Sequence, residues 1–370
     1  MTAVRLEPFV PDYASAPGES LRETLDSLGM SQADLARRSG LSPKHNNQII
    51  QGVASLSTDT ALAFERVTGT PAAFWSNLEA NYQLHRTKQA EVANADDDVE
   101  WVKAFPLTEL RRREVISAER DPLLIREELF AFFGVASRKA WDEVWTVPAA
   151  SFRRSKAFRV DDYATACWLR FGEREAVQTA AVPFDAGRFR RGLSRIRRVI
   201  TADPEVWEPV MRDECAKSGV VVALVPEVKG SRAHGAVRWL SASKAMLQLS
   251  VRQRWEDQFW FTFFHEAAHL LLHGKRDAFV DYAGEKGDGE EDEANLFAQR
   301  MLIPAEEEPR LQSLRTAPEI RLFADELRLP PGIVVGRLQH DRIVPFSFGH
   351  RLRRQLELVE EPKSASSGSQ

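Results

Sequence analysis

The sequence has 370 residues, of which 43% are hydrophobic and 28% are charged, and both values are ordinary for a water-soluble globular protein. A chain of this length exceeds one ordinary hydrophobic core, so we expect two or three domains. The 50 basic side chains oppose 54 acidic ones, which gives a formal net charge of -4. This balance excludes a global attraction to nucleic acid, so any DNA contact must come from a local surface.

No segment of the sequence indicates export or membrane insertion. The N-terminal stretch MTAVRLEPFVPDY has neither a long apolar core nor a small-residue cleavage site. The longest apolar run, residues 259–264, is far shorter than the roughly 20 residues that cross a bilayer. Cys167 and Cys215 form no CxxC motif, and we expect both to be reduced packing residues. The expected location is the cytoplasm, with no membrane partner.

The N-terminal region, residues 15–85, is predicted to be an all-α domain of five short helices. Capping serines and threonines, prolines in first turns and terminal glycines punctuate it. Ser20 with Glu23 three residues later has the pattern of a capping box, which would start the first helix at Ser20. The expected helices cover residues 20–28, 31–39, 42–51, about 58–68, and 71–83.

The second and third of these helices, SQADLARRSG and SPKHNNQIIQG, have the spacing of a helix-turn-helix. With the later segment TPAAFWSNLEANY, they resemble the XRE-type domain of HigA-like antitoxins. The resemblance implies operator DNA as a partner and a homodimer formed through this domain. Side chains suited to bases or phosphates are Lys44, His45, Asn47, Gln48 and Gln51.

One residue departs from the pattern of that family. Asn46 stands where the family normally buries Val or Ile, and a buried unpaired amide costs about 1–3 kcal/mol. The domain is also nearly neutral, whereas DNA-binding domains are usually basic. A five-helix module for dimerisation or for a protein partner is therefore the alternative to DNA binding.

The rest of the chain is predicted to be α+β. Residues 86–100 are polar and suit a solvated linker or an exposed helix extension, and residues 101–215 are mainly helical, with core aromatics at 130, 132, 133, 141 and 145. Short β-branched runs follow from about 218: VVVALVP, GAVRWL and KAMLQLSV. These strands belong to a predicted domain of residues 216–345. After them we expect a long helix over about 257–273, a loop rich in Gly, Asp and Glu, a helix ending at Pro304, and two helices over 317–340. The tail, 360–370, has a disordered composition.

The motif HEAAH carries the clearest chemistry in the sequence. His265 and His269 lie four residues apart on a predicted helix, so both imidazoles project from one face and can bind one Zn²⁺. Glu266 stands beside them as a general base that takes a proton from water at neutral pH. His234 and His273 carry weaker signals, either as surface or supporting residues or as groups that steady an oxyanion.

A tetrahedral catalytic zinc needs a third protein ligand. Glu290, Glu291 and Glu293 on the next predicted helix are the candidates. Glu291 precedes Ala294 by three residues and Ala298 by seven, so it shares their inward face, and we favour it. Glu293 falls at the edge of that face, and Glu290 reaches it only if the helix extends toward Gly289.

FFHEAAHLLLHG followed by EDEANLFAQRMLIP resembles the ImmA/IrrE family of metallopeptidases over roughly residues 215–305. The resemblance implies a minimal thermolysin-like, or gluzincin, core with His265, His269 and Glu291 as zinc ligands and Glu266 as the base. It places Asn295 where related enzymes use an Asp to orient the first histidine. It also implies a protein substrate, a repressor or antitoxin-like regulator in a stress, prophage or toxin–antitoxin setting.

Two classes of function follow from these motifs. The first is a zinc endopeptidase with a DNA-binding module. The second is a non-enzymatic transcription regulator or antitoxin that uses the metallopeptidase fold as a sensor or scaffold. The intact HEAAH favours the enzyme, because a scaffold has no need of Glu266.

Overall fold

A computed structural model of the chain describes residues 14–93, 98–146, 161–250, 255–273, 278–282 and 289–357. The chain divides into two compact units, Met1–Val99 and Glu100–Gln370. The tail predicted over 360–370 and residues 94–97 of the predicted linker lie outside the described residues. No helix in the described ranges is both long enough and apolar enough to cross a membrane.

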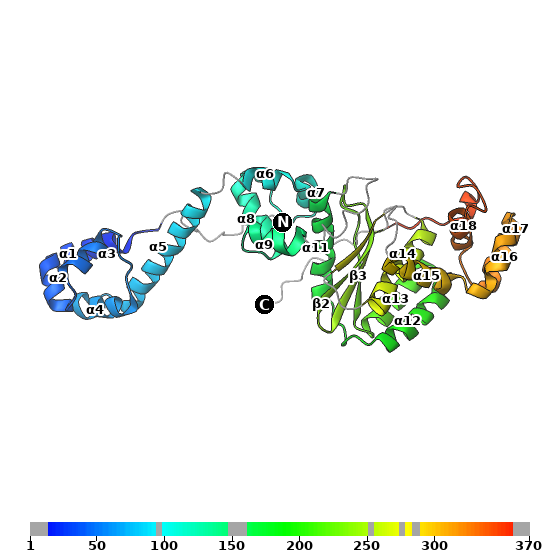
Figure 1. The fold of residues 1–370 in the computed structure, drawn as a ribbon. Helices are drawn as coiled ribbons and strands as arrows, with labels where there is room; N and C mark the ends of the chain where they lie inside the picture. Colours follow the sequence, from blue (N-terminus) through cyan, green and yellow to red (C-terminus); the bar gives the residue numbers. More distant parts are fainter. Residues whose placement is uncertain are drawn as a thin grey trace, which may run out of the picture. The chain divides into compact units, whose positions relative to one another are not determined.

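The described part of the first unit is all-α, as predicted (Figure 1). Its helices are α1 (Pro17–Ser27), α2 (Gln32–Ser39), α3 (Pro43–Ile50), α4 (Thr58–Thr68) and α5 (Ala72–Ala93). The side chains of Ser31, Ser42 and Ser57 cap the starts of α2, α3 and α4. α5 continues well beyond His85, so residues 86–93 form the helix extension that the sequence left as one of two alternatives.

The first helix begins three residues before the predicted start, so the capping box at Ser20 is wrong. Pro17 occupies the first turn of α1, where its missing N–H is not needed. Gly18 follows, and a Cβ atom there would clash with the carbonyl oxygens of Ile49 and Ile50. The start of α1 thus packs directly on the end of α3, a contact that a local capping pattern does not contain.

The buried face of α3 contains Asn46, as the sequence predicted. This side chain is 1% exposed beside buried Ile49 and Ile50. Neither its amide nitrogen nor its oxygen has a hydrogen-bond partner within the described residues. A polar group buried in this way destabilises the folded state, because it loses its hydrogen bonds to water.

The second unit is α+β and begins within α6 (Asp98–Lys103). Its strands are β1 (Val220–Leu224), β2 (Ala233–Ser241), β3 (Lys244–Leu249) and β4 (Ala278–Tyr282). Its further α-helices are α7 (Leu107–Arg112), α8 (Pro122–Phe133), α9 (Arg138–Trp141), α11 (Asp162–Gln178), α12 (Ala186–Val199), α13 (Pro204–Ala216), α14 (Glu256–Leu272), α15 (Gly289–Leu302), α16 (Glu308–Ser313), α17 (Ala317–Leu327) and α18 (Pro331–His340). Three single turns are η1 (Asp142–Thr146), η2 (Ala305–Glu307) and η3 (His350–Leu352).

The strands form one mixed sheet in the order β1-β3-β2-β4. β1 runs parallel to β3, while β2 runs antiparallel to both β3 and β4. The strand β4 lies in the segment that the sequence predicted to be only a loop, and α16 was also not predicted. β4 has five residues, too few for a clear periodicity, and it forms through backbone pairing with β2.

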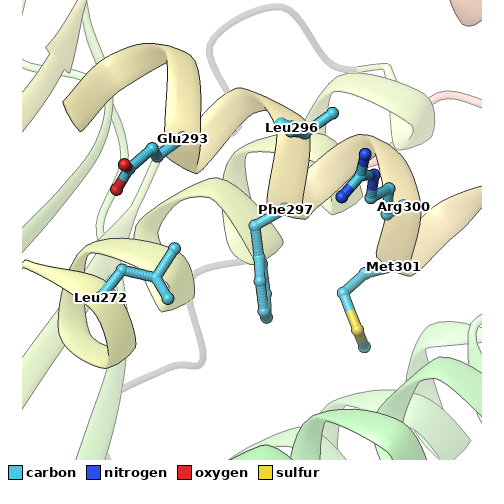
Figure 2. Close-up of a pocket in the computed structure, with 6 residues that line it drawn as sticks. All are labelled: Leu272, Glu293, Leu296, Phe297, Arg300 and Met301. Atoms are coloured by element: carbon cyan, nitrogen blue, oxygen red, sulfur yellow. The ribbon is translucent and has the colours of Figure 1, made fainter. Parts of the chain in front are cut away.

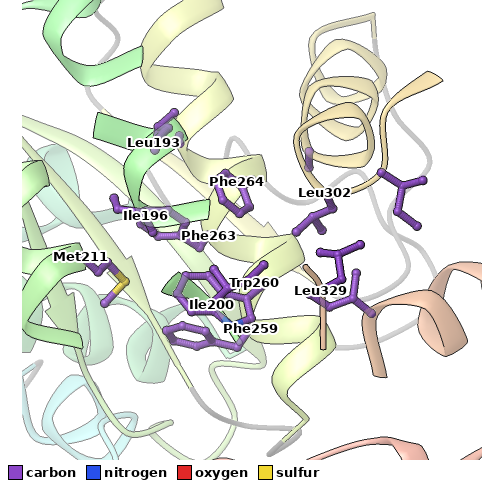
Figure 3. Packing of buried hydrophobic residues seen from close by; sticks show 14 of the residues in the cluster. Leu193, Ile196, Ile200, Met211, Phe259, Trp260, Phe263, Phe264, Leu302 and Leu329 are labelled. Carbon is purple, nitrogen blue, oxygen red and sulfur yellow. The ribbon is translucent and has the colours of Figure 1, made fainter. Parts of the chain in front are cut away.

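Helices cover both faces of the sheet (Figure 1). Val220 and Val222 join the core formed with α12, α13 and α14, whereas Val221 and Ala223 join the core with α11. Burial on both faces explains why β1 is a continuous apolar run. Figure 3 shows the first core, in which aromatic side chains of α14 meet aliphatic side chains of α12.

The predicted core aromatics and both cysteines of the second unit lie in its cores. The rings at 132, 133, 141 and 145 are buried, and Phe130 packs at the edge of the same cluster. This arrangement confirms a packing role for these aromatics. Cys167 and Cys215 are buried free thiols, and burial raises the pKa of both well above the ordinary range.

Two arginines near the end of the chain hold the start of α14. Arg353 donates to both carboxylate oxygens of Asp257 at 3.0 and 2.8 Å, and Arg354 pairs with Glu256. Burial raises the pKa of both carboxyl groups, and the arginines oppose that effect. The start of α14 is therefore fixed by charge-assisted bonds in a largely buried setting.

A third arginine holds the far end of α15. Arg197 of α12 donates to the carbonyl oxygens of Met301, Leu302, Leu327 and Arg328 at 3.0–3.1 Å. These carbonyls lie at the C-terminal ends of α15 and α17, where a cation compensates the helix dipole and the unpaired acceptors. Burial lowers the pKa of Arg197 to about 10, so the side chain is still charged at neutral pH.

The buried amide of α3 generates the first testable prediction. Asn46→Val should stabilise the first unit by about 1–3 kcal/mol, because it replaces an unpaired buried amide with an apolar group. Hydrogen exchange of the α3 amides in the whole chain measures this change. The matched control is Asn47→Val, the same replacement at the next, exposed position, which should change stability by no more than about 0.5 kcal/mol. Equal effects at the two positions would contradict the prediction.

Candidate functional site

The HEAAH motif lies in the C-terminal half of α14, inside the core of the second unit. His265 and His269 are each 2% exposed, and Glu266 is fully buried. Ala267 and Ala268 between the histidines are also fully buried. Small side chains at these positions let neighbouring elements approach α14 closely.

The structure brings His265, His269 and Glu291 together. The Nε2 atoms of the two histidines are 3.0 Å apart. The carboxylate oxygens of Glu291 lie 3.2 Å from Nε2 of His265 and 3.4 Å from Nε2 of His269. Ligands bound at 2.0–2.2 Å around tetrahedral zinc are about 3.3–3.6 Å apart. The spacing and chemistry of these donors therefore fit a zinc ion.

Of the three acidic candidates, Glu291 is the one that α15 places beside both histidines. α15 packs against α14 and buries Ala294 and Ala298, and Glu291 lies on the same face, as the periodicity predicted. Glu293 is 67% exposed and contacts His273 instead. The helix does extend to Gly289, yet among the described residues the cluster able to hold a metal contains Glu291 and not Glu290.

The electrostatics of the cluster suit a cation. Burial lowers the pKa of His269 to about 3, so its ring is neutral at pH 7. A neutral imidazole is the form that binds metals. Burial alone would raise the pKa of Glu291, but the adjacent His265, His269 and His273 lower it below the ordinary value. Glu291 is therefore a carboxylate at neutral pH.

Each histidine of the cluster makes a second contact through Nδ1, on the side of the ring away from the other candidate ligands. Oδ1 of Asn295 lies 3.1 Å from Nδ1 of His265, at the position that the family resemblance indicated. Nδ1 of His269 lies 2.8 Å from Nδ1 of His273. His273 is 6% exposed, which agrees with the supporting role that the sequence left open for it. No sequence pattern indicated the further contact of His273 with Glu293.

A glycine on β2 lies against the candidate general base. A Cβ atom at Gly235 would be 2.5 Å from Oε1 of Glu266 and 2.6 Å from Cγ2 of Thr262. The strand can therefore approach α14 only because this residue has no side chain. Sequence reasoning missed Gly235, although a glycine inside a strand is a known signal for close approach. The buried His234 precedes it on β2.

An apolar pocket of about 380 Å³ lies beside the C-terminal end of α14 (Figure 2). Glu293, a contact of His273, stands at one side of it. The lining residues are Leu272, Glu293, Leu296, Phe297, Arg300 and Met301. The pocket therefore borders the supporting contacts of the cluster and not the three candidate ligands.

The candidate DNA-contacting residues lie on and beside α3 of the first unit. Lys44, Asn47 and Gln51 are exposed, and His45 and Gln48 are half-buried. Lys44, Gln48 and Gln51 recur at helical spacing on the face opposite the buried Asn46. The structure thus presents a polar face of the second helix of a helix-turn-helix, as a DNA-reading helix requires.

Family models match a part of each unit. Residues 217–339 match the model of a peptidase family described as the IrrE N-terminal-like domain. Residues 21–75 match the model described as Helix-turn-helix. The first match contains α14 and α15, and the second contains α2 and α3.

Individual relatives match the N-terminal part. Virulence-associated protein I of Dichelobacter nodosus is 36% identical over 74 residues, which are 20% of this chain and 68% of that protein. The uncharacterized HTH-type transcriptional regulator YddM of Escherichia coli (strain K12) is 29% identical over 68 residues, which are 18% of this chain and 72% of that protein. A structure of the Pseudomonas aeruginosa antitoxin HigA with the higBA promoter is 32% identical, with a TM-score of 0.22, and the match covers 24% of this chain and 96% of that one.

The two matched regions are adjacent parts of one chain, and the C-terminal match spans the HEAAH helix and the helix that carries Glu291. The chain therefore combines a C-terminal domain of the IrrE-like peptidase family with an N-terminal helix-turn-helix domain of the XRE type.

Proposed function

We propose that this protein is a gluzincin-like zinc endopeptidase that cleaves a specific regulatory protein and docks on operator DNA through its first unit. The observation that carries the enzymatic part is the convergence of His265, His269 and Glu291 beside the buried Glu266. His265, His269 and Glu291 would hold the metal and leave a fourth position open, as in catalytic zinc sites.

The chemistry of peptide hydrolysis follows from these residues. Bound zinc supplies a Lewis acid that polarises the scissile carbonyl and lowers the pKa of water. Glu266 accepts the proton of the attacking water and returns it to the leaving amine. Asn295 holds His265 in the tautomer that presents Nε2 to the cluster. Gly235 lets β2 pack directly on Glu266, which restricts the positions that the carboxylate can take.

The choice of substrate is proposed to come from docking. We place the protein in the cytoplasm, where an unselective peptidase would attack the cell's own proteins. Binding of a partner away from the zinc can position one scissile loop at Glu266, which gives selectivity without a deep specificity pocket. A repressor or antitoxin-like regulator, in a stress, prophage or toxin–antitoxin setting, is the proposed substrate.

DNA binding is proposed for the first unit as a homodimer on an inverted repeat. The match to the helix-turn-helix model and the polar face of α3 support it, as does the relative named as a transcriptional regulator. Lys44 would contact phosphate or guanine, and Asn47, Gln48 and Gln51 would contact base edges. His45 lies near the start of α3, where it suits a phosphate contact.

The zinc site is tested by metal content. The purified chain should hold about one zinc, and the His265→Ala/His269→Ala variant should hold none, because two of three ligands are removed. Glu291→Gln should lose most of the zinc, whereas Glu293→Gln, a matched change on the same helix, should retain it, because the amide oxygen of Gln can still accept a hydrogen bond from His273. Elemental analysis measures each variant. An unchanged zinc content in the double-histidine variant would refute the site.

The catalytic role is tested with Glu266→Gln. This variant should keep its zinc and its fold but lose about 10²–10⁴-fold in cleavage rate, because only proton transfer is removed. Comparing the proteomes of cells that express the wild type or Glu266→Gln should reveal the substrate as a protein depleted only by the wild type. Casein is the control substrate and should stay intact. Equal cleavage by both forms would show that the cleavage comes from elsewhere, and a wild type that depletes no protein would support the non-enzymatic alternative.

DNA binding is tested by salt-dependent gel shifts with the region upstream of the protein's own gene. Affinity should fall as salt rises, because phosphate contacts release counterions. Lys44→Ala should lower the slope of log affinity against log salt by about 0.9, the value of one phosphate contact. Lys88→Ala, which removes the same charge from exposed α5 of the same unit, should leave the slope unchanged. Equal affinity for the upstream region and for random DNA would remove the hypothesis.

A further inference from the structure

A chain of polar contacts runs from the candidate zinc ligand His269 to the surface. Nδ1 of His269 lies 2.8 Å from Nδ1 of His273, and Nε2 of His273 lies 3.3 Å from Oε2 of Glu293. His273 is buried immediately after the end of α14, while Glu293 is an exposed residue of α15. The contacts therefore join the two helices that supply the zinc ligands.

The carboxylate of Glu293, at the exposed end of this series of contacts, determines which ring nitrogens carry a hydrogen. The carboxylate of Glu293 can only accept a hydrogen bond, so Nε2 of His273 must carry the hydrogen. When the His273 ring carries this single hydrogen, its Nδ1 is an acceptor, and Nδ1 of His269 carries the hydrogen that lies between the two rings. Nε2 of His269 is left with its lone pair, and this is the atom that lies near Glu291 and His265.

We propose that His273 and Glu293 form a positioning relay that fixes His269 in its metal-binding tautomer and ring orientation. This inference rests on the zinc site of the proposed function. It adds two residues that do not bind the metal but support the ligand His269 through its Nδ1 atom. The relay does for His269 what Asn295 does for His265. Contacts of this type raise the basicity of the ligand and hold its ring in place.

The helix α15 supplies both carboxylates that act on His269, Glu291 directly and Glu293 through His273. Glu291 reaches the Nε2 side of the histidines, whereas Glu293 reaches the Nδ1 side of His269 through His273. Figure 2 shows Glu293 projecting from α15 toward the end of α14 that carries Leu272. One helix thus holds His269 from two sides. Glu293 is 67% exposed, so water competes with it, and its share of the effect should be smaller than that of His273.

Zinc affinity in competition with a chelator tests the relay. His273→Ala should weaken zinc binding about 10- to 100-fold, the usual range for loss of a supporting contact. His273→Asn places an acceptor oxygen near the former Nδ1 and should restore most of the affinity, whereas the apolar His273→Leu should not. Glu293→Ala should weaken binding less than His273→Ala, and the combined variant should be less than additive. His340→Ala removes an exposed histidine and serves as the control.

The tautomers give a second readout that does not depend on the metal. Long-range nitrogen–proton correlation spectra of the zinc-free full chain should show the hydrogen on Nδ1 of His269 and on Nε2 of His273. Opposite tautomers, or unchanged zinc affinity in His273→Ala, would overturn the relay. If the wild type bound no zinc, the proposed function would fail, and the spectra alone would then decide whether the relay exists.

Discussion

The two buried histidines of α14 depend on hydrogen-bond partners that neighbouring residues must hold in place. α14 places two imidazoles and a carboxylate among buried aromatic and alanine side chains. A buried polar group without a partner costs free energy, so the structure around α14 must provide donors and acceptors at fixed places. Asn295 provides one for His265 and His273 provides one for His269. Both depend on the exact placement of α15 against α14.

That placement is maintained by arginines outside the cluster. Arg197 holds the C-terminal end of α15 through backbone carbonyls, and Arg353 and Arg354 hold the start of α14 through buried carboxylates. All three side chains come from segments distant in sequence from the residues they fix. A bidentate guanidinium pairs with a carboxylate in one defined geometry, which suits a scaffold that must keep atoms aligned. The two helices are thus anchored at the ends farthest from the candidate ligands.

Local sequence patterns predicted the elements that depend on local interactions. Ser31, Ser42 and Ser57 mark helix starts because each caps its own helix, and the spacing of His265 and His269 depends only on the helical repeat. The predictions failed where a distant contact decides the outcome. The start of α1 depends on α3, and β4 exists through pairing with β2. The roles of Gly235 and Glu293 appear only when β2 and α15 pack on α14, which no local pattern encodes.

The way the donors are held bears on the kind of zinc site proposed here. In a structural zinc site, four ligands come from segments that the metal itself folds together, and binding energy becomes folding energy. Here three donors stand within 4.8 Å of one another on helices that other interactions already fix. Metal binding then contributes little to folding. The free energy of binding can instead be used to polarise a fourth, exchangeable ligand. Three preorganised donors beside a buried carboxylate are the arrangement that hydrolysis requires and that a purely structural ion does not.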